Sequence, residues 1–345
     1  MPLLLNILFT PEVTSDKGVF VLLMKELGRV AKYWGDKFGV AQEGLINKCI
    51  DKLKEIQDRE DKAWRATLFA LQALCSVNLS FEELIPALEI FLQLLENCPS
   101  AYCIEQVCHG IYCITGRYGM CRCGDYFMPG SGIPKTLMRL GQKAENRRHV
   151  FNVLGNLSAL PTIVDELLAL DVLNIAAQNF ASDDFPLQHS SAQMLTNITA
   201  GTTEQTEAVI FHKKLMESFL TFSHFWLAAT LCNSTAHQST NIIGKLVEIG
   251  CIECFCKLLG KNCEMDALCL EGLSNILQDG ERLVNEEIFF NPYALRFADC
   301  EGLELLNDVA EDFVDDVDDI LSFFGEKYEV FLARKRGLLT KSARS

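Results

Sequence analysis

The segment that decides the fold runs from Ser190 to Ile210 and reads SSAQMLTNITAGTTEQTEAVI. The apolar spacing of its first half predicts a helix with Asn197 on the flank of the buried face. Gly201 is a typical C-terminal stop for that helix. Thr202, followed three residues later by Gln205, is a capping box that begins the next helix.

This pattern recurs along the chain. Clear copies are VFNVLGNLSAL, ATLCNSTAH and LEGLSNILQ, and weaker ones are KELGRVAKY, LFALQALCS and HGIYCITGR. The flank positions of the copies, Asn197 included, are Arg29, Ala73, Cys113, Asn156, Asn197, Asn233 and Asn275. Their spacings are 44, 40, 43, 41, 36 and 42 residues, and a period near 40 in an all-helical pattern indicates armadillo or HEAT repeats.

We therefore expect an all-α fold, a right-handed superhelical armadillo-repeat solenoid. Residues 1–330 should form one array of about seven to eight repeats, the first of them incomplete. Residues 331–345 carry five basic and no acidic side chains, so we expect a flexible basic tail.

Composition narrows the classes of partner. The 345 residues have a net charge of −15, which argues against nucleic-acid binding because a phosphate backbone needs a basic surface. An acidic surface suits a basic protein partner. The longest mainly apolar uncharged stretch is too short to span a membrane. Fifteen cysteines without a visible secretory signal indicate reduced thiols, in the cytoplasm or nucleus.

Four segments give specific structural expectations. Pro2 to Phe9 looks like a short apolar helix, and Phe81 to Leu95 is interpreted as two successive helices of one repeat. Gly116 to Pro134, with five glycines and two prolines, predicts a loop or broken helix. Asp299 to Asp319 holds ten acidic residues and no basic one, yet its apolar stripe predicts an amphipathic acidic helix.

No catalytic or cofactor motif is visible. There is no nucleophile–base set, phosphate-binding glycine loop or HExxH motif, so neither an enzyme nor a bound cofactor is expected. His109 lies near several cysteines in the sequence, among them Cys121 and Cys123 on the irregular segment. Their spacing fits no zinc pattern well, and cysteines on helices are usually core residues, so no metal site is predicted.

Several motifs resemble the armadillo repeats of importin alpha, the adaptor that carries nuclear-localisation signals. They are LTNITAGTTEQTEAVI, LVEIGCIECFCKLL and LEGLSNILQDGERL, together with NPYALRFADCEGLELL and VDDILSFFGE near the end. The likeness is strongest from Asn156 to Gly325. The family's first repeats and its N-terminal importin-beta-binding segment have no counterpart.

This resemblance implies two side-by-side rows on the third helices. Asparagines in one row pair with the backbone of an extended peptide, and tryptophans four residues earlier sandwich lysine side chains. The chain keeps the first row at Asn156, Asn197, Asn233 and Asn275. The second row has no tryptophan and holds Lys25, Phe69, His109, Asn152, Gln193, Ala229 and Glu271. Ser190 and Trp226 replace acidic residues that flank the family's C-terminal pocket.

Two functions remain open. The first is a shortened nuclear import adaptor that binds basic segments of cargo across the four asparagines, with Gln193 and Asn152 beside them. It would act in the cytoplasm and nucleus and meet the importin-alpha export receptor at its C-terminal repeats, with weak or absent importin-beta binding. The second is an armadillo scaffold for another protein, in which signal binding is lost and the asparagines bond to their own or adjacent helices.

Overall fold

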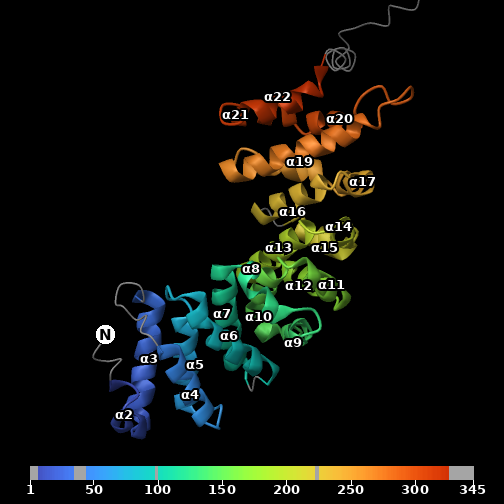
Figure 1. Ribbon diagram of the computed structural model, residues 1–345. Helices are drawn as coiled ribbons and strands as arrows, with labels where there is room; N and C mark the ends of the chain where they lie inside the picture. The colour runs from blue at the N-terminus through green and yellow to red at the C-terminus, as the bar shows by residue number, and fades with distance from the viewer. Residues whose placement is uncertain (1–6, 35–43, 98–99, 222–224, 326–345) are drawn as a thin grey trace, which may run out of the picture. The chain divides into compact units, whose positions relative to one another are not determined.

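The computed structural model describes residues 7–34, 44–97, 100–221 and 225–325. All regular structure in these ranges is helical, without any β-strand (Figure 1). The expected all-α fold is therefore confirmed. The expected tail, 331–345, and most of the expected helix from Pro2 to Phe9 lie outside the described residues. None of the described helices is both long and apolar enough to cross a membrane.

Contacts between Cα atoms divide the chain into two compact units. Unit 1 comprises residues 1–175 and 184–194, and unit 2 comprises residues 176–183 and 195–345. Two helices, α12 (Val172–Phe180) and α13 (Phe185–Thr199), contribute residues to both units.

Unit 1 consists mainly of helix pairs. Its helices are α2 (Pro11–Ser15), α3 (Lys17–Trp34), α4 (Leu45–Glu55), α5 (Lys62–Leu74), α6 (Phe81–Glu96), α7 (Ala101–Tyr118), α8 (Met120–Cys123), η1 (Gly124–Phe127), α9 (Ile133–Gly141), α10 (Ala144–Leu157) and α11 (Pro161–Ala169). The pairs are α4 with α5, α6 with α7, and α9 with α10. The long helices α3, α5, α7 and α10 contact one another in that order. This face of successive long helices carries the flank positions of unit 1.

Unit 2 repeats a fuller module, in which two short helices precede a third. Its helices are α14 (Thr203–Ile210), α15 (Lys213–Phe219), α16 (Phe225–Ala236), α17 (Thr240–Glu248), α18 (Cys251–Leu258), α19 (Cys263–Glu281), α20 (Pro292–Asp299), α21 (Gly302–Val309) and α22 (Val314–Ser322). The third helices α16 and α19 pack directly against each other, and α19 packs on α22. This is the three-helix arrangement expected of an armadillo repeat.

Local signals in the sequence set several of these boundaries. The Thr202 capping box forms: the Gln205 amide N–H donates to the Thr202 hydroxyl at 3.3 Å and the Thr202 N–H donates to Gln205 Oε1 at 3.1 Å. Gly250 adopts a left-handed φ of 95° between α17 and α18, a conformation that costs glycine little. Pro161 occupies the first turn of α11, where its missing N–H leaves no hydrogen bond unmade.

Two helix predictions are wrong. The segment read as two helices, from Phe81, is one helix, α6, which continues through Pro86 because Leu84, Leu88 and Phe91 stay in phase and buried. The acidic segment read as one helix is two helices, α21 and α22, which follow the end of α20. The break falls at Phe313, whose φ of −133° and ψ of 49° are not helical.

The irregular segment from Gly116 is the broken helix that its glycines predict. Helix α7 runs on to Tyr118, and Gly119 then takes a left-handed φ of 68°. The short helices α8 and η1 follow before α9 begins at Ile133.

The same joint between a glycine and a phenylalanine ring recurs in both units. In unit 1 a Cβ on Gly110 of α7 would lie 2.3 Å from the Phe91 ring, and in unit 2 a Cβ on Gly272 of α19 would lie 2.5 Å from the Phe255 ring. Both rings are fully buried. Each glycine stands three residues before a flank position, so the close approach of the ring fixes how the helix that carries the glycine sits on the helix before it.

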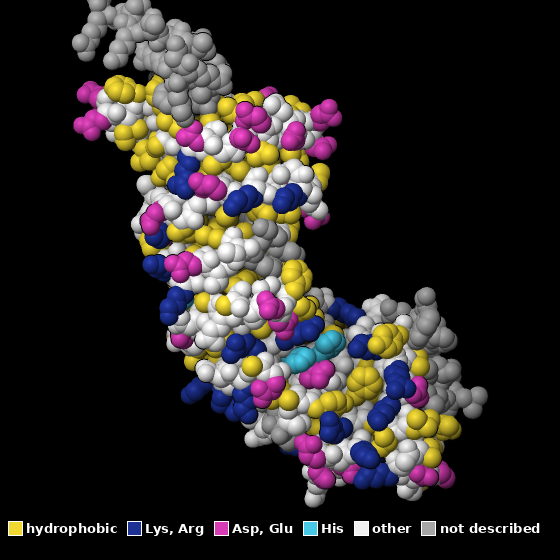
Figure 2. All heavy atoms as spheres, turned by 180° about the vertical axis from the view of Figure 1, so that it is seen from behind, with side chains coloured by type: hydrophobic (Ala, Val, Ile, Leu, Met, Phe, Trp, Pro, Cys, Tyr) yellow, Lys and Arg dark blue, Asp and Glu magenta, His cyan; other side chains and the backbone are white. Residues whose placement is uncertain are grey.

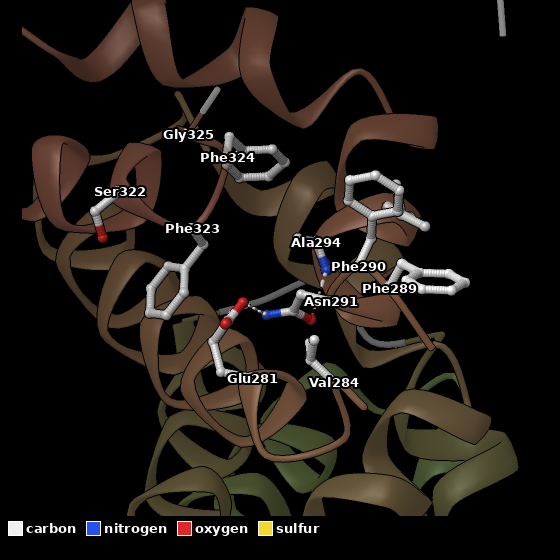
Figure 3. Close-up of a pocket in the computed structure, with 11 residues that line it drawn as sticks. Glu281, Val284, Phe289, Phe290, Asn291, Ala294, Ser322, Phe323, Phe324 and Gly325 are labelled. Atoms are coloured by element: carbon white, nitrogen blue, oxygen red, sulfur yellow. Dashed lines mark hydrogen bonds between the residues drawn. The ribbon is translucent and has the colours of Figure 1, made fainter. Parts of the chain in front are cut away.

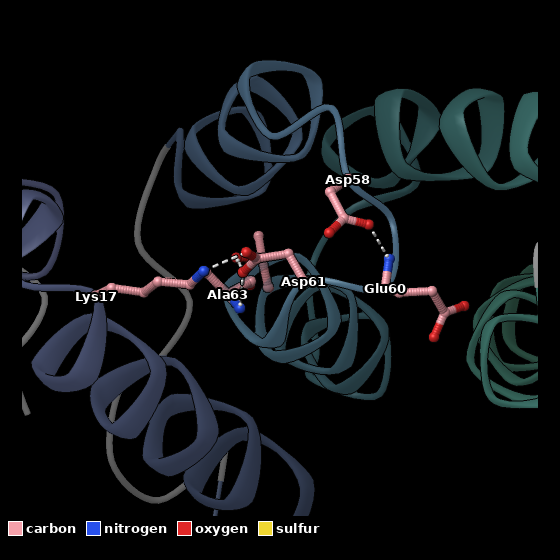
Figure 4. Close-up of polar contacts among 6 residues, drawn as sticks. Lys17, Asp58, Glu60, Asp61 and Ala63 are labelled. Carbon is pink, nitrogen blue, oxygen red and sulfur yellow. Dashed lines mark hydrogen bonds and ion pairs between the residues drawn. The ribbon is translucent and has the colours of Figure 1, made fainter.

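The start of α3 is tied to the start of α5 by charged side chains (Figure 4). Asp61 caps α5, accepting the Ala63 amide N–H at 2.7 Å, and it also pairs with Lys17 of α3. The hydrogen bond from Lys17 lowers the pKa of Asp61, and the Ala63 amide adds to that effect. This ion pair links the start of α3 to the start of α5.

Candidate functional site

The asparagines at the flank positions join consecutive long helices within each unit. In unit 1, Asn156 Nδ2 on α10 donates to the Tyr112 carbonyl at 3.2 Å and to Thr115 Oγ1 at 2.9 Å, both on α7. In unit 2, Asn233 Nδ2 on α16 donates to the Thr196 carbonyl of α13 at 3.0 Å.

Asn275 Nδ2 on α19 donates to Thr235 Oγ1 of α16 at 3.1 Å. Asn197 also has an interaction partner. These bonds follow one register. The carbonyl acceptors lie one residue before the previous flank position and the threonine hydroxyls two residues after it. Each of the three amide nitrogens is thus held within the protein.

The amide oxygens of the same side chains remain available. Among the described residues, Oδ1 of Asn156, Asn233 and Asn275 accepts no hydrogen bond, and all three side chains are half-buried. A half-buried acceptor without a partner favours a ligand that brings N–H groups. What the row offers is therefore an acceptor, not the donor–acceptor pair that a free amide would offer.

The positions four residues earlier differ from one another. In unit 1, Asn152 Oδ1 accepts a hydrogen bond from the Ser190 hydroxyl, and Gln193 lies against Gly155, whose Cβ would be 3.4 Å from Gln193 Oε1. In unit 2, Ala229 is buried, whereas Glu271 is exposed and lies near Cys232. Of these side chains, Glu271 adds a charge beside an asparagine.

In the weaker copies of the repeat, which lie in unit 1, the flank positions carry residues other than asparagine. Arg29 is exposed and pairs with Glu26, with 2.5 Å between Nη1 and Oε1. Ala73 is fully buried and is not available to a ligand. Cys113 is half-buried, with its sulfur 3.5 Å from His109 Nδ1.

The charge of the two units differs strongly. The described residues of unit 1 carry 17 Lys or Arg and 19 Asp or Glu side chains, whereas those of unit 2 carry 7 and 23. Nearly all of the acidity of the described chain therefore belongs to unit 2. A cationic ligand is attracted there by the summed field as well as by individual side chains.

The histidine and cysteines that the sequence brings together lie mostly in the core. Cys103, Cys108 and Cys123 are buried, and burial raises the pKa of Cys108 to about 12. His109 Nδ1 lies 2.6 Å from Gln72 Nε2. The pKa of His109 is lowered, chiefly by burial and then by Lys32 and His149. The described residues contain no group of three His, Cys, Asp or Glu side chains arranged to hold a metal ion.

Unit 2 also contains a cavity of about 590 Å³ between the end of α19, α20 and the segment after α22 (Figure 3). Its wall is aromatic, with Phe289, Phe290, Phe323 and Phe324. Asn291 organises the polar side by donating to the Leu277 carbonyl at 2.7 Å and to Glu281 at 3.0 Å, while it caps α20. Sequence reasoning missed this cavity, although the exposed Phe289 in NEEIFFNPY is a visible signal.

Comparison with known proteins identifies a fold but no relative. No family model and no curated protein sequence matches the chain. Its structure is similar to that of an engineered protein with a TM-score of 0.56 at 13% identity, covering 94% of this chain and 98% of that one. Two designed armadillo repeat proteins are similar at TM-scores of 0.43 and 0.49, with 15% and 14% identity. They cover 80% and 74% of this chain and 99% and 98% of theirs, and the second is in complex with the peptide (KR)4.

Proposed function

We propose that this armadillo-repeat protein is an interaction scaffold whose unit 2 binds extended basic segments of other proteins, as an adaptor of the importin-alpha type would. The observation that carries the proposal is the open Oδ1 acceptor on Asn233 and Asn275 in the strongly acidic unit. Backbone N–H groups and lysine or arginine heads are all donors, so an extended basic peptide complements these acceptors.

The affinity should be modest. Glu271 supplies a negative charge one turn from Asn275, but the described third helices of unit 2 place Ala229 and Glu271 where indoles would sandwich a lysine. Each missing cation–π contact forgoes about 0.5–2 kcal/mol of binding free energy. The role we propose is therefore that of a weak, charge-guided adaptor.

A scaffold that has lost signal binding is the second candidate. It is favoured by the amide nitrogens of Asn156, Asn233 and Asn275, which are used to join neighbouring helices. In that case the asparagines support the structure, and substituting them changes stability without changing affinity for basic peptides.

Substitutions of Asn275 separate the two candidates. Asn275→Asp keeps the oxygen acceptors and adds a negative charge, but it loses the N–H group that donates to Thr235, whose own hydroxyl donates to the Cys232 carbonyl. Asn275→Ala removes the acceptor, and a lost hydrogen bond in this setting costs about 1 kcal/mol, or roughly fivefold in affinity. Gln278→Ala, on an exposed side chain of the same helix, is the matched control.

The measurement is fluorescence anisotropy with a labelled lysine-rich peptide, with the unfolding midpoint of each variant recorded alongside. We expect Asp to tighten binding, Ala to weaken it and the control to leave it unchanged. If all three variants bind the peptide as the unsubstituted chain does, the signal-binding role is wrong and the second candidate replaces it.

The proposal also predicts that the protein moves between the cytoplasm and the nucleus. The adaptor would bind cargo in the cytoplasm, release it in the nucleus, and meet an export receptor through its C-terminal repeats. A fluorescent fusion that stays outside the nucleus when nuclear export is blocked would contradict this part. The tail residues Arg334 to Arg336, which lie outside the described residues, should be deleted in a parallel fusion.

A further inference from the structure

Unit 1 contains a cavity of about 460 Å³ whose charged lining is entirely basic. Helix α3 contributes Lys25 and Arg29, α5 contributes Lys62, Arg65 and Phe69, and α7 contributes Tyr102. Arg29 is at a flank position and Lys25 is four residues earlier. In the other copies these two positions carry neutral or acidic side chains. We call this cavity the basic pocket.

Close packing gives the basic pocket a rigid aromatic wall. A Cβ on Gly28 would lie 2.5 Å from the Phe69 ring, so only glycine lets this ring lie directly against α3. Tyr102 donates its hydroxyl to the Arg65 carbonyl at 3.1 Å. The Arg65 guanidinium carbon is 4.3 Å from the centre of the Tyr102 ring. A guanidinium stacked in this way is held by its face, while its N–H groups lie at the edge and can pair with a planar anion.

The countercharges nearby are too few to neutralise the basic pocket. Glu26 pairs with Arg29 at 2.5 Å, Glu60 lies 3.7 Å from Arg65, and the charge of Glu105 acts on Tyr102. Lys25 and Lys62 are exposed and form no ion pair within the described residues. Lysine and arginine side chains gather around apolar side chains on this face of unit 1 (Figure 2).

We propose that the basic pocket binds an acidic polypeptide segment, with carboxylates paired to Lys25, Lys62 and Arg65 and the peptide's carbon atoms resting on Phe69 and Tyr102. Carboxylates match the fork of Arg65 in two parallel hydrogen bonds. A long polyanion such as nucleic acid would be repelled by the net charge of −15 on the whole chain. A short acidic segment avoids that cost. The basic pocket lies in unit 1 and would bind an acidic ligand, whereas the proposed function places a basic ligand on unit 2.

The test is anisotropy titration of the full chain with a labelled peptide of alternating Asp and Glu. The variant is Lys25→Gln with Lys62→Gln. Its matched control is Lys135→Gln with Lys143→Gln, two exposed lysines of unit 1 outside the pocket. Each pair removes the same charge, and thermal melts establish that both variants fold. A third variant, Arg65→Lys, keeps the charge but loses the planar fork.

We expect the pocket pair to weaken acidic-peptide binding at least about fivefold at low salt, since two ion pairs are lost. The control pair should change it less than about twofold, and Arg65→Lys should weaken it measurably. Equal weakening by both pairs, or no weakening by the pocket pair, would overturn the proposal. A single-stranded oligonucleotide of equal charge is the competing ligand. The proposal would also be overturned if this oligonucleotide bound more tightly than the acidic peptide and if the Lys25→Gln with Lys62→Gln variant no longer bound it. Binding of the lysine-rich peptide should be unchanged in every variant, which keeps this test independent of the role of unit 2.

Discussion

Unit 1 and unit 2 use the same kind of long helix to present different chemistry. In unit 1 the rows carry Lys25, Arg29 and Phe69, which line a basic pocket. In unit 2 they carry Asn233, Asn275 and Glu271, with open acceptors in an acidic setting. In both units a glycine on one helix packs against a buried phenylalanine ring on the helix before it. The comparison shows that a shared joint can keep its geometry while the charge of the exposed row changes sign.

The largest expected effect comes from breaking that joint. Gly272→Ala places a methyl group 2.5 Å from the buried Phe255 ring. Overpacking of this kind lowers the free energy of unfolding by about 1–3 kcal/mol, which urea titration measures. Gly110→Ala should act likewise against Phe91 in unit 1. Gly244→Ala, whose new Cβ would meet only Tyr293 Oη at 3.9 Å, is the control and should be neutral or stabilising. A loss equal to that of Gly272→Ala in this control would show that the ring contact is not the cause.

A smaller loss is expected where the asparagines join neighbouring helices. Asn156→Ala removes two hydrogen bonds to α7 and should cost roughly 1–2 kcal/mol of unfolding free energy, whereas Asn275→Ala removes one and should cost about 1 kcal/mol. Chemical denaturation of both variants measures the loss of unfolding free energy in unit 1 (Asn156→Ala) and in unit 2 (Asn275→Ala). If Asn275→Ala proves the more costly, the hydrogen-bond count does not explain the contribution of the row to stability.

A third difference should appear on acidification. The pKa values of His109, His149 and His189, all in unit 1, are lowered from the ordinary 6.5, chiefly by burial. The unfolded chain then binds protons that the folded chain does not, so stability is present above pH 6.5 and is lost as the pH falls below it. Lys32 also disfavours the charged form of His109, while Glu105 favours it.

Urea midpoints at pH 7.5 and at pH 5.5 test this expectation. The neutral variant His109→Gln, which can still accept a hydrogen bond from Gln72, should lose less stability between the two conditions than the unsubstituted chain. The same loss in both proteins would mean that His109 contributes nothing to the pH dependence.

Capping and turn residues act locally, and the repeat period shows that one helical pattern recurs along the chain. Together they predict much of the fold. The Thr202 capping box and the all-α helical pattern are found where the residues indicate. The break at Phe313 was not predictable, because Val309, Phe313, Val317 and Ile320 continue a helical stripe without glycine or proline. The continuous α6 was missed for the opposite reason: Pro86 looks like a boundary, but buried residues on both sides keep the helix in phase.

The sites depend on contacts between distant residues, and the sequence gives only part of them. It places Lys25 and Arg29 in the rows, but Lys62 and Arg65 join them because Gly28 lets α5 pack closely on α3, and Tyr102 joins them because α7 packs on α5. Likewise, the asparagine row is visible in the sequence, whereas the use of each amide nitrogen depends on a threonine or a carbonyl about 40 residues earlier.

Hydrogen–deuterium exchange of the full chain, measured separately with the acidic and with the lysine-rich peptide, tests the opposed chemistry of the two units most directly. The account predicts that the acidic peptide slows exchange in α3, α5 and the first turns of α7, while the lysine-rich peptide slows exchange in α16 and α19. Protection of the same helices by both peptides, or of α16 and α19 by the acidic one, would contradict it.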